Sequence, residues 1–269
     1  MGLALIKFFT EISEQFVDPL RPERPPLSGN QGLLALNRAE RIDEYRSSVK
    51  QSVPNALARQ QYTYMPTVHT VPIPIPPADP TQPWPNGQVI WMNSSADGGL
   101  PHTRAPFYIC LPESINIKML ASTLLHERIH VSQRLHPNAW IDLIESAWSM
   151  TQYVEPSFPQ ELESRLRINP DLLGAPHFIW KNEWMPLGIF KSINKPVLSE
   201  IDIVWWNPTT RTIHRQSPPG WDAYFGKNPA GEHPYEIAAY LIASSVESSN
   251  IPAYQALKSR LGSLPRNEI

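Results

Sequence analysis

The sequence predicts an α+β fold, with a small mixed sheet, one helix rich in titratable side chains, and further helices toward the C-terminus. Two short segments rich in β-branched and aromatic residues, 88–92 and 107–111, are predicted to be strands. Segment 117–134 then carries apolar residues at helical spacing and has no Gly or Pro. The chain also has 30 prolines in 269 residues, about twice the ordinary usage, so many segments must run as extended loops.

A Pro-rich N-terminal extension, residues 1–85, is expected to lie on a body formed by residues 86–269 rather than to fold by itself. Residues 3–16 and 33–51 show the apolar periodicity that is typical of helices. The run 66–85 is dense in proline and is predicted to be extended. We expect this run to lie as a strap on the protein surface, and its alternative role is to bind the aromatic groove of a protein partner.

The body is predicted to alternate between loops, helices and strands. A polar loop joins the first two strands and has Asp97-Gly98-Gly99 at its tip, and His136-Pro137-Asn138 is expected to end the helix that begins near residue 117. Further helices are expected at 139–153, 159–168, from Pro234 onward and at 252–261, and strands at 178–180, 187–190, 201–206 and 210–214, the last two joined by a turn at Asn207-Pro208-Thr209.

Composition and charge exclude several classes of function. The formal net charge is −2, so no strong field attracts nucleic acid or an anionic lipid surface. No apolar run approaches the length of about 18 residues that a membrane span needs, so we expect no transmembrane segment. The first residues lack a basic region and a cleavage site, so we recognise no signal peptide and expect an intracellular protein.

The single cysteine and three of the tryptophans are expected in the core. Cys110 excludes an internal disulfide, and its apolar neighbours predict a buried position in a strand. Trp205, Trp206 and Trp221 are expected to pack inside the protein rather than to line a substrate pocket.

The strongest chemical signal is His126-Glu127-x-x-His130 in the predicted helix at 117–134. Residues four apart lie on one face of a helix, so the two imidazoles can bind one zinc ion. Glu127 stands beside the first histidine and is expected to act as a general base toward water activated by the metal. The alternative is a buried helix in which both histidines are satisfied in the core and no metal is bound.

A zinc site needs a third protein ligand, and the sequence offers three candidates. Glu236 is preferred, because Pro234 fits the first position of a helix whose first turn then presents the carboxylate; its alternative role is to favour the helix dipole. His136 has the spacing of the third metzincin histidine, but Gln133 stands where their sharp turn needs glycine. Glu145 lies on the next predicted helix and would require the chain to fold back tightly.

The motif helix together with Pro234-Tyr235-Glu236-Ile237-Ala238-Ala239 resembles the gluzincin group of zincin metallopeptidases, in which a later helix supplies a glutamate ligand. The resemblance covers these two short motifs only. It implies a zincin-like fold and a single Zn²⁺ ion held by His126, His130 and Glu236. It also implies that Glu127 is the general base.

These features predict a zinc-dependent endopeptidase that acts on a peptide or protein substrate. The strand just before the motif helix, 107–111, is expected to be an exposed edge that holds an extended peptide across the metal. The alternative function is a zinc-binding but non-catalytic structural or interaction protein, in which Glu127 would have no role as a base. Four residues are candidate donors to the oxyanion, and the sequence does not single one out: Tyr224, Tyr235, His214 and Tyr240.

Overall fold

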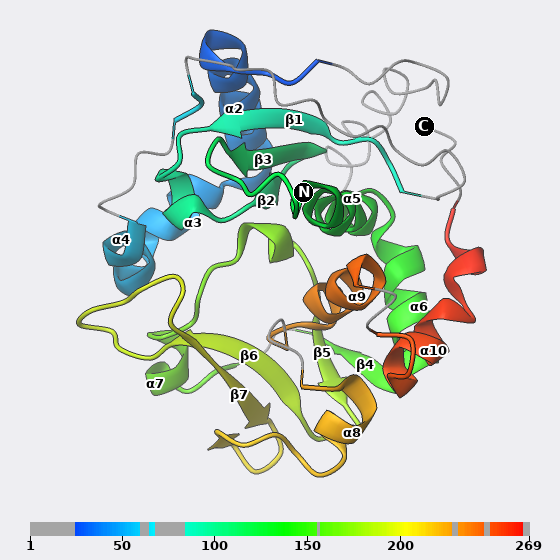
Figure 1. Cartoon of the computed structure of the whole chain (residues 1–269). Coiled ribbons are helices and arrows are strands. Elements are labelled where there is room, and N and C mark those ends of the chain that lie inside the picture. The colour runs from blue at the N-terminus through cyan, green and yellow to red at the C-terminus, as the bar shows by residue number, and fades with distance from the viewer. Residues whose placement is uncertain are drawn as a thin grey trace, which may run out of the picture.

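The computed structural model of the chain has a mixed α+β architecture with small sheets (Figure 1), which confirms the fold class at that level. It describes residues 25–59, 65–67, 84–154, 157–227, 231–244 and 248–265. The helix expected at 3–16 and most of the Pro-rich run lie outside the described residues, and the division of the chain at residue 85 stays a prediction. Within the described residues, every helix is too short or too polar to cross a membrane.

Three helices occupy the described N-terminal part: α2 (Gly29–Asp43), α3 (Tyr45–Gln51) and α4 (Val53–Arg59). The single helix expected at 33–51 is therefore wrong, because the chain breaks at Glu44, which has a left-handed backbone with φ of 50°. The Glu40 carboxylate at the end of α2 accepts hydrogen bonds from the backbone N–H groups of Arg46 and Ser47. These bonds satisfy the N-terminal donors of α3 and so stabilise the second helix.

The first sheet has the strand order β1-β3-β2 and consists of β1 (Gln88–Met92), β2 (His102–Arg104) and β3 (Tyr108–Pro112). β1 pairs parallel with β3, and β2 pairs antiparallel with β3. The predicted strands at 88–92 and 107–111 are thus confirmed with a shift of one residue in the second. β2 lies in a stretch that was expected to be loop, beyond the short 3₁₀ segment Ala96–Gly99.

The expectation of an exposed edge strand before the motif helix is wrong. β3 lies in the middle of its sheet, and hydrogen bonds also cover both outer edges. Leu27 and Thr67 pair through backbone bonds with β1, whereas on β2 the Thr103 N–H donates to the Asp171 carboxylate over 2.6 Å. In the described residues, this sheet therefore offers no open backbone edge at these positions to an extended peptide.

The motif helix is α5 (Leu120–Leu135), and α6 (Pro137–Trp148) follows after the single residue His136. Pro137 has no N–H to continue α5 and fits the first position of α6, so the predicted break is confirmed. α6 ends earlier than expected, because Ser149 adopts a left-handed backbone with φ of 51°. The next residues form strand β4 (Met150–Tyr153) instead of helix.

The second half of the chain contains the remaining strands and helices, and Figure 1 shows α5 and α9 side by side between the upper sheet and the lower one. The strands predicted in this half are confirmed within a few residues. The predicted turn before β8 is stabilised by Asn207, whose side-chain oxygen accepts hydrogen bonds from the backbone N–H groups of Thr209 and Thr210. These elements are β5 (His177–Trp180), β6 (Met185–Phe190), β7 (Ile201–Asn207), β8 (Thr212–His214), α7 (Gln160–Glu163), α8 (Trp221–Phe225), α9 (Pro234–Ala243), α10 (Pro252–Lys258) and the 3₁₀ segments η2 (Pro170–Leu172) and η3 (Leu261–Ser263).

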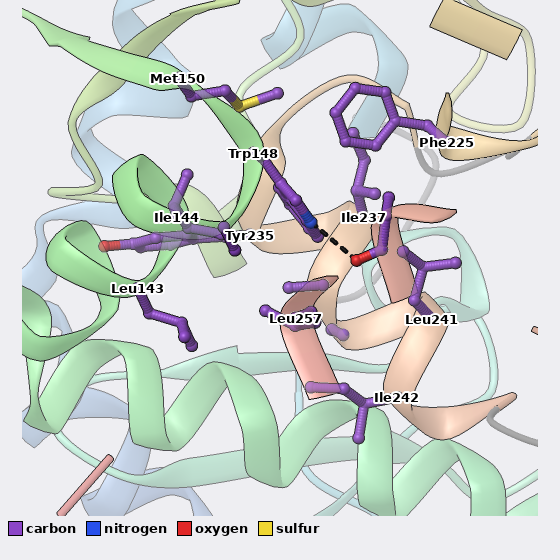
Figure 2. Packing of buried hydrophobic residues seen from close by; sticks show 14 of the residues in the cluster. Leu143, Ile144, Trp148, Met150, Phe225, Tyr235, Ile237, Leu241, Ile242 and Leu257 are labelled. Carbon is purple, nitrogen blue, oxygen red and sulfur yellow. Dashed lines mark hydrogen bonds between the residues drawn. The ribbon is translucent and has the colours of Figure 1, made fainter. Parts of the chain in front are cut away.

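The largest apolar core lies where α6, α8, α9 and α10 meet (Figure 2). Trp148 from α6 packs edge-on against Phe225, and its indole N–H donates to the Ala253 carbonyl of α10 over 2.8 Å. A buried indole that finds such a partner loses no hydrogen bond on leaving water. The core also contains Trp205 and Trp221, and Trp206 and Cys110 are buried in two smaller clusters, so the core positions predicted for these residues are confirmed.

A charged cluster is buried where α2 meets β2. The Arg104 side chain is fully buried and donates to both oxygens of Asp43 over 2.8 Å and to Glu40 over 2.9 Å. Burial opposes ionisation of Asp43, but the hydrogen bonds and charge of Arg104 outweigh it and lower the pKa of this carboxyl. The cluster therefore ties the N-terminal helices to the sheet through a paired, desolvated charge.

Removal of Arg104 should be strongly destabilising. The Arg104→Met variant leaves the buried carboxylate of Asp43 and the partly exposed carboxylate of Glu40 without their cation, which should lower the free energy of unfolding by about 3–5 kcal/mol. Urea unfolding measures this loss without adding salt that screens charges. The exposed Arg260 provides the control Arg260→Met, and equal stability of the two variants would show that the buried pair contributes nothing.

Candidate metal centre

Helices α5 and α9 bring together three side chains that the sequence analysis singled out, His126, His130 and Glu236. The two imidazole Nε2 atoms lie 3.0 Å apart. Glu236 Oε2 lies 3.4 Å from His126 Nε2 and 3.5 Å from His130 Nε2. The His130 side chain is fully buried, whereas that of His126 is 23% exposed, so the cluster meets solvent mainly at His126.

A hydrogen bond to Gln133 orients the His130 ring. His130 Nδ1 lies 2.7 Å from Gln133 Oε1, and Gln133 Nε2 donates to the Tyr235 carbonyl of α9 over 3.0 Å. The second bond fixes the amide, so its oxygen can only accept and Nδ1 must carry the proton. Nε2 then keeps its lone pair for a metal, which is the usual support of a histidine ligand. The same amide joins α5 to α9.

Glu236 stands in the first turn of α9 and uses its two oxygens differently. Oε1 accepts from Asn169 Nδ2 over 2.7 Å, and Oε2 faces the two imidazoles. Burial raises the pKa of this carboxyl, but the charge of His130 and hydrogen bonds from both histidines outweigh burial and hold it well below the ordinary value. The group is therefore an anion that can face a cation.

The cluster as a whole attracts positive charge. Burial lowers the pKa of His130, yet the negative charges of Glu236 and Asp171 prevail and raise it to about 10. A proton is therefore held strongly between these residues. A metal cation could take the place of this proton, because the same Nε2 atoms can coordinate it.

Glu127 lies next to the cluster as a buried carboxylate. Its Oε2 atom has no hydrogen-bond partner within the described residues. Burial, followed by repulsion from Asp171 and opposed in part by His130, raises the pKa of Glu127 well above its ordinary value. A buried carboxylate oxygen without a partner is costly and so indicates a group or water molecule that completes the site.

The Asn169 amide and the Glu232 carboxylate hold Glu236 in position. The second hydrogen of the Asn169 amide goes to Glu232 Oε1 over 2.8 Å, and Arg167 Nη1 lies 3.4 Å from the same oxygen. Glu232 fits because Gly188 on β6 has no side chain, and a Cβ atom built there would overlap the Glu232 carboxylate. The position of Glu236 thus depends on a glycine in a strand far away in sequence.

The two other candidates for the third ligand lie outside the cluster. His136 is the residue between α5 and α6, and burial alone lowers its pKa. Glu145 Oε1 accepts from the Gln152 N–H over 2.9 Å at the other end of α6. Neither side chain belongs to the group formed by His126, His130 and Glu236, so the spacing shared with metzincins does not bring a third histidine to the cluster.

The four candidate oxyanion donors are not gathered at the cluster. Tyr224 donates to the Ala147 carbonyl over 3.0 Å, and His214 packs edge-on against Trp184 on the lower sheet. The Tyr235 ring packs against Trp140 in the core and not against the metal cluster. Its hydroxyl has no hydrogen-bond partner in the described residues. The structure gives no contact that selects Tyr240.

Two imidazole nitrogens and one carboxylate oxygen, all within 4.8 Å of one another, are a donor set that fits a zinc ion. Gln133, Asn169, Glu232 and Gly188 support the site, and their role was not predicted from the sequence. Of these, Gln133 alone carried a local signal, since it lies three residues after His130 on the same helix face. Comparisons with family models, with curated proteins and with solved structures gave no match to this chain.

A side chain at position 188 should weaken the site without touching a ligand. The Gly188→Ala variant should displace Glu232 and with it Asn169 and Glu236, lowering zinc affinity by about 10–100-fold, as is usual when the supports of a ligand are lost. Competition with a chromophoric chelator measures the affinity. Gly262→Ala is the matched control, because a Cβ atom there meets no neighbour within 4 Å. Equal zinc affinities for both variants would contradict the coupling through Glu232.

His233 should make the metal-free protein sensitive to mild acid. Its Nδ1 caps α9 by accepting from the Tyr235 N–H, and its Nε2–H donates to the Pro176 carbonyl, so the ring is held neutral. Burial lowers the pKa of His233 from 6.5 to about 4. The neutral form stabilises the fold fully above pH 6.5, and this contribution is lost as pH falls from 6.5 to 4, because the unfolded chain binds the proton first.

The His233→Asn variant keeps a capping oxygen but does not titrate. The loss of stability between pH 7 and 4, measured by urea unfolding in the presence of a chelator, should be smaller in the variant by up to about 3 kcal/mol. Parallel pH profiles for the two proteins would show that His233 titrates normally in the folded state.

Proposed function

We propose that this protein is a zinc-dependent endopeptidase with a single Zn²⁺ ion held by His126, His130 and Glu236. The observation that carries the proposal is the convergence of His126 Nε2, His130 Nε2 and Glu236 Oε2 from two helices. A zincin-like fold belongs to the same proposal. It is supported by the passage from β3 into the motif helix α5 and by the arrival of the carboxylate from the later helix α9.

The metal and the residues around it would have separate roles in hydrolysis of a peptide bond. A bound zinc ion supplies Lewis acidity, which polarises the peptide carbonyl and makes water easier to deprotonate. Glu127 takes the proton from the attacking water and returns it to the leaving amine nitrogen. Burial raises the pKa of Glu127 well above its ordinary value, which favours uptake of a proton by this carboxyl. Gln133 and Asn169 hold the imidazole and the carboxylate in place.

The covered sheet edges bear on how a substrate binds. Because Asp171 takes the Thr103 N–H on β2, and Leu27 and Thr67 cover β1, a peptide cannot add a strand at these positions without displacing them. We therefore propose that the substrate approaches the exposed side of His126 through side-chain contacts or a loop rather than by strand addition.

The covered edges also favour a second candidate function. A zinc-binding protein with a structural or interaction role needs the three ligands but no strand site for a peptide. Such a protein has no use for a general base, so the role of Glu127 separates the two functions. A protein partner for the Pro-rich N-terminal region would belong to this second candidate.

Metal analysis and cleavage assays test the proposal. The purified chain should bind one zinc ion, and His130→Ala should strongly weaken this binding because two protein ligands hold zinc with lower affinity than three. Incubation with a peptide library should give cleavage that Glu127→Gln reduces by at least about 10²-fold, the lower end of what a general base contributes. The variant should still bind zinc.

Glu163→Gln, at an exposed position of α7, is the matched control for loss of a carboxylate. Zinc binding without cleavage by the unchanged chain would favour the structural candidate. Binding of zinc that does not depend on His130 would overturn both.

A further inference from the structure

An extended segment, residues 165–168, leads directly into Asn169, which supports the metal cluster. The segment runs antiparallel beside β6, and its backbone bonds to this strand at Arg165 and Arg167 measure 2.9 and 3.0 Å. Successive side chains of an extended segment point to opposite faces, so Arg167 and Asn169 lie on the same face. On that face Asn169 donates to Glu236 over 2.7 Å. The course of this segment therefore decides where one support of a metal ligand lies.

Side chains of helix α4 form hydrogen bonds with the outer edge of this segment. Asn55 Nδ2 donates to the Leu166 carbonyl over 2.7 Å, and the Ile168 N–H donates to Asn55 Oδ1 over 2.8 Å. Arg59 Nη2 donates to the Ile168 carbonyl over 2.8 Å. The Asn55 amide therefore supplies the donor and the acceptor that the backbone of a neighbouring strand would supply.

The helix and the segment depend on each other. Asn55 is fully buried, so loss of its amide would leave a carbonyl and an N–H of the segment without partners and away from water. α4 has 7 residues, fewer than the about 12–15 that an isolated helix needs. The buried apolar cluster that contains its Ala58 is small and has only Phe190 and Leu198 as further members. The hydrogen bonds of Asn55 and Arg59 are therefore a main tie between α4 and the body of the protein.

Arg59 also connects this edge with the upper sheet. Its Nε atom lies 2.8 Å from Asp97 Oδ1, in the 3₁₀ segment between β1 and β2. The Tyr45 hydroxyl donates to the same carboxylate over 2.7 Å. α4 thus joins the upper sheet to the lower one, and α5 and α9, which carry the metal cluster, lie between these sheets (Figure 1).

We propose that α4 is a latch that controls the zinc affinity of the metal centre, with Asn55 as a positioning residue that acts through the segment 165–168 and Asn169. This inference rests on the proposed zinc site. While α4 is docked, Ile168 is bonded to it through both its N–H and its carbonyl, and the next residue, Asn169, is held at Glu236. When α4 leaves, the segment loses these outer bonds, and Asn169 no longer fixes the Glu236 carboxylate toward the two imidazoles. The N-terminal region thereby regulates the metal centre from a distance.

Substitution of Asn55 tests the latch in the full chain. Leucine is close to asparagine in size but forms no side-chain hydrogen bond, so Asn55→Leu should lower the zinc affinity by about tenfold, the lower end of the loss that follows when supports of a ligand are removed. Competition with a chromophoric chelator measures the affinity. Asn55→Asp keeps an acceptor for the Ile168 N–H but loses the donor for Leu166. Its zinc affinity should therefore lie between those of the unchanged chain and Asn55→Leu.

Asn207→Leu is the matched control for a loss of stability alone. Asn207 is also buried and also bonds two backbone groups, but these belong to the turn before β8. Urea unfolding with a chelator present should show that both leucine variants are destabilised, whereas Asn207→Leu should bind zinc as the unchanged chain does. The latch is overturned if Asn55→Leu keeps the full zinc affinity, or if Asn207→Leu loses as much.

A double variant tests the route through Asn169. In an Asn169→Ala background the path from the segment to Glu236 is already cut, so Asn55→Leu should lower the zinc affinity by less than about twofold, because residues that act through one another are not additive. A further tenfold loss in this background would contradict transmission through Asn169.

The coupling must also act in the opposite direction, since a linkage between two sites is reciprocal. Zinc at saturation should slow hydrogen exchange of the Ile168 N–H by about tenfold in the unchanged chain, as followed by NMR, because it favours the docked latch. An exchange rate that zinc does not alter would overturn the proposal. These measurements need zinc binding but no cleavage. A chain that shows the expected affinities yet cleaves no peptide supports the latch and overturns the endopeptidase, whereas a chain that binds no zinc overturns both.

Discussion

The interaction on which the site depends is the contact of one buried carboxylate, Glu236, with two imidazoles on another helix. A carboxylate that leaves water must be hydrogen-bonded or paired with a cation, or it will be protonated. Asn169 satisfies one oxygen, and the other oxygen faces His126 and His130. The arrangement is therefore stable only if a proton or a metal ion is held among the three side chains.

The packing of α5 against α9 makes this contact possible. Ala238 and Ala239 are fully buried next to Glu236, and their small side chains allow a close approach of the two helices. Gln133 bridges the helices through the Tyr235 carbonyl and at the same time fixes the His130 ring. One amide thus couples helix packing to the orientation of a metal ligand. In metzincins this position is a glycine that turns the chain, whereas here α5 continues to Leu135.

The sequence was informative where a signal was local. His126, Glu127 and His130 lie within one helical turn and a half, and the strands with branched side chains fall close to where they were expected. The break between α5 and α6 could also be predicted from the sequence, because Pro137 lacks the N–H that a continuous helix needs. The choice of Glu236 over His136 and Glu145 also came from local helix chemistry at Pro234.

Contacts distant in sequence were beyond the reach of such signals. The covered edge of β2 follows from the Asp171 carboxylate, which is 68 residues away from Thr103. Gly188 resembled any glycine in a strand until the structure placed Glu232 against it. Tertiary structure therefore decided which edges are open and which side chains support the cluster.

Diffraction from zinc-loaded crystals at wavelengths on either side of the zinc absorption edge measures the central claim most directly. The expected result is one anomalous peak at about 2.0–2.2 Å from His126 Nε2, His130 Nε2 and an oxygen of Glu236. A peak elsewhere in the molecule, or the same two imidazoles packed together with no peak beside them, would contradict it.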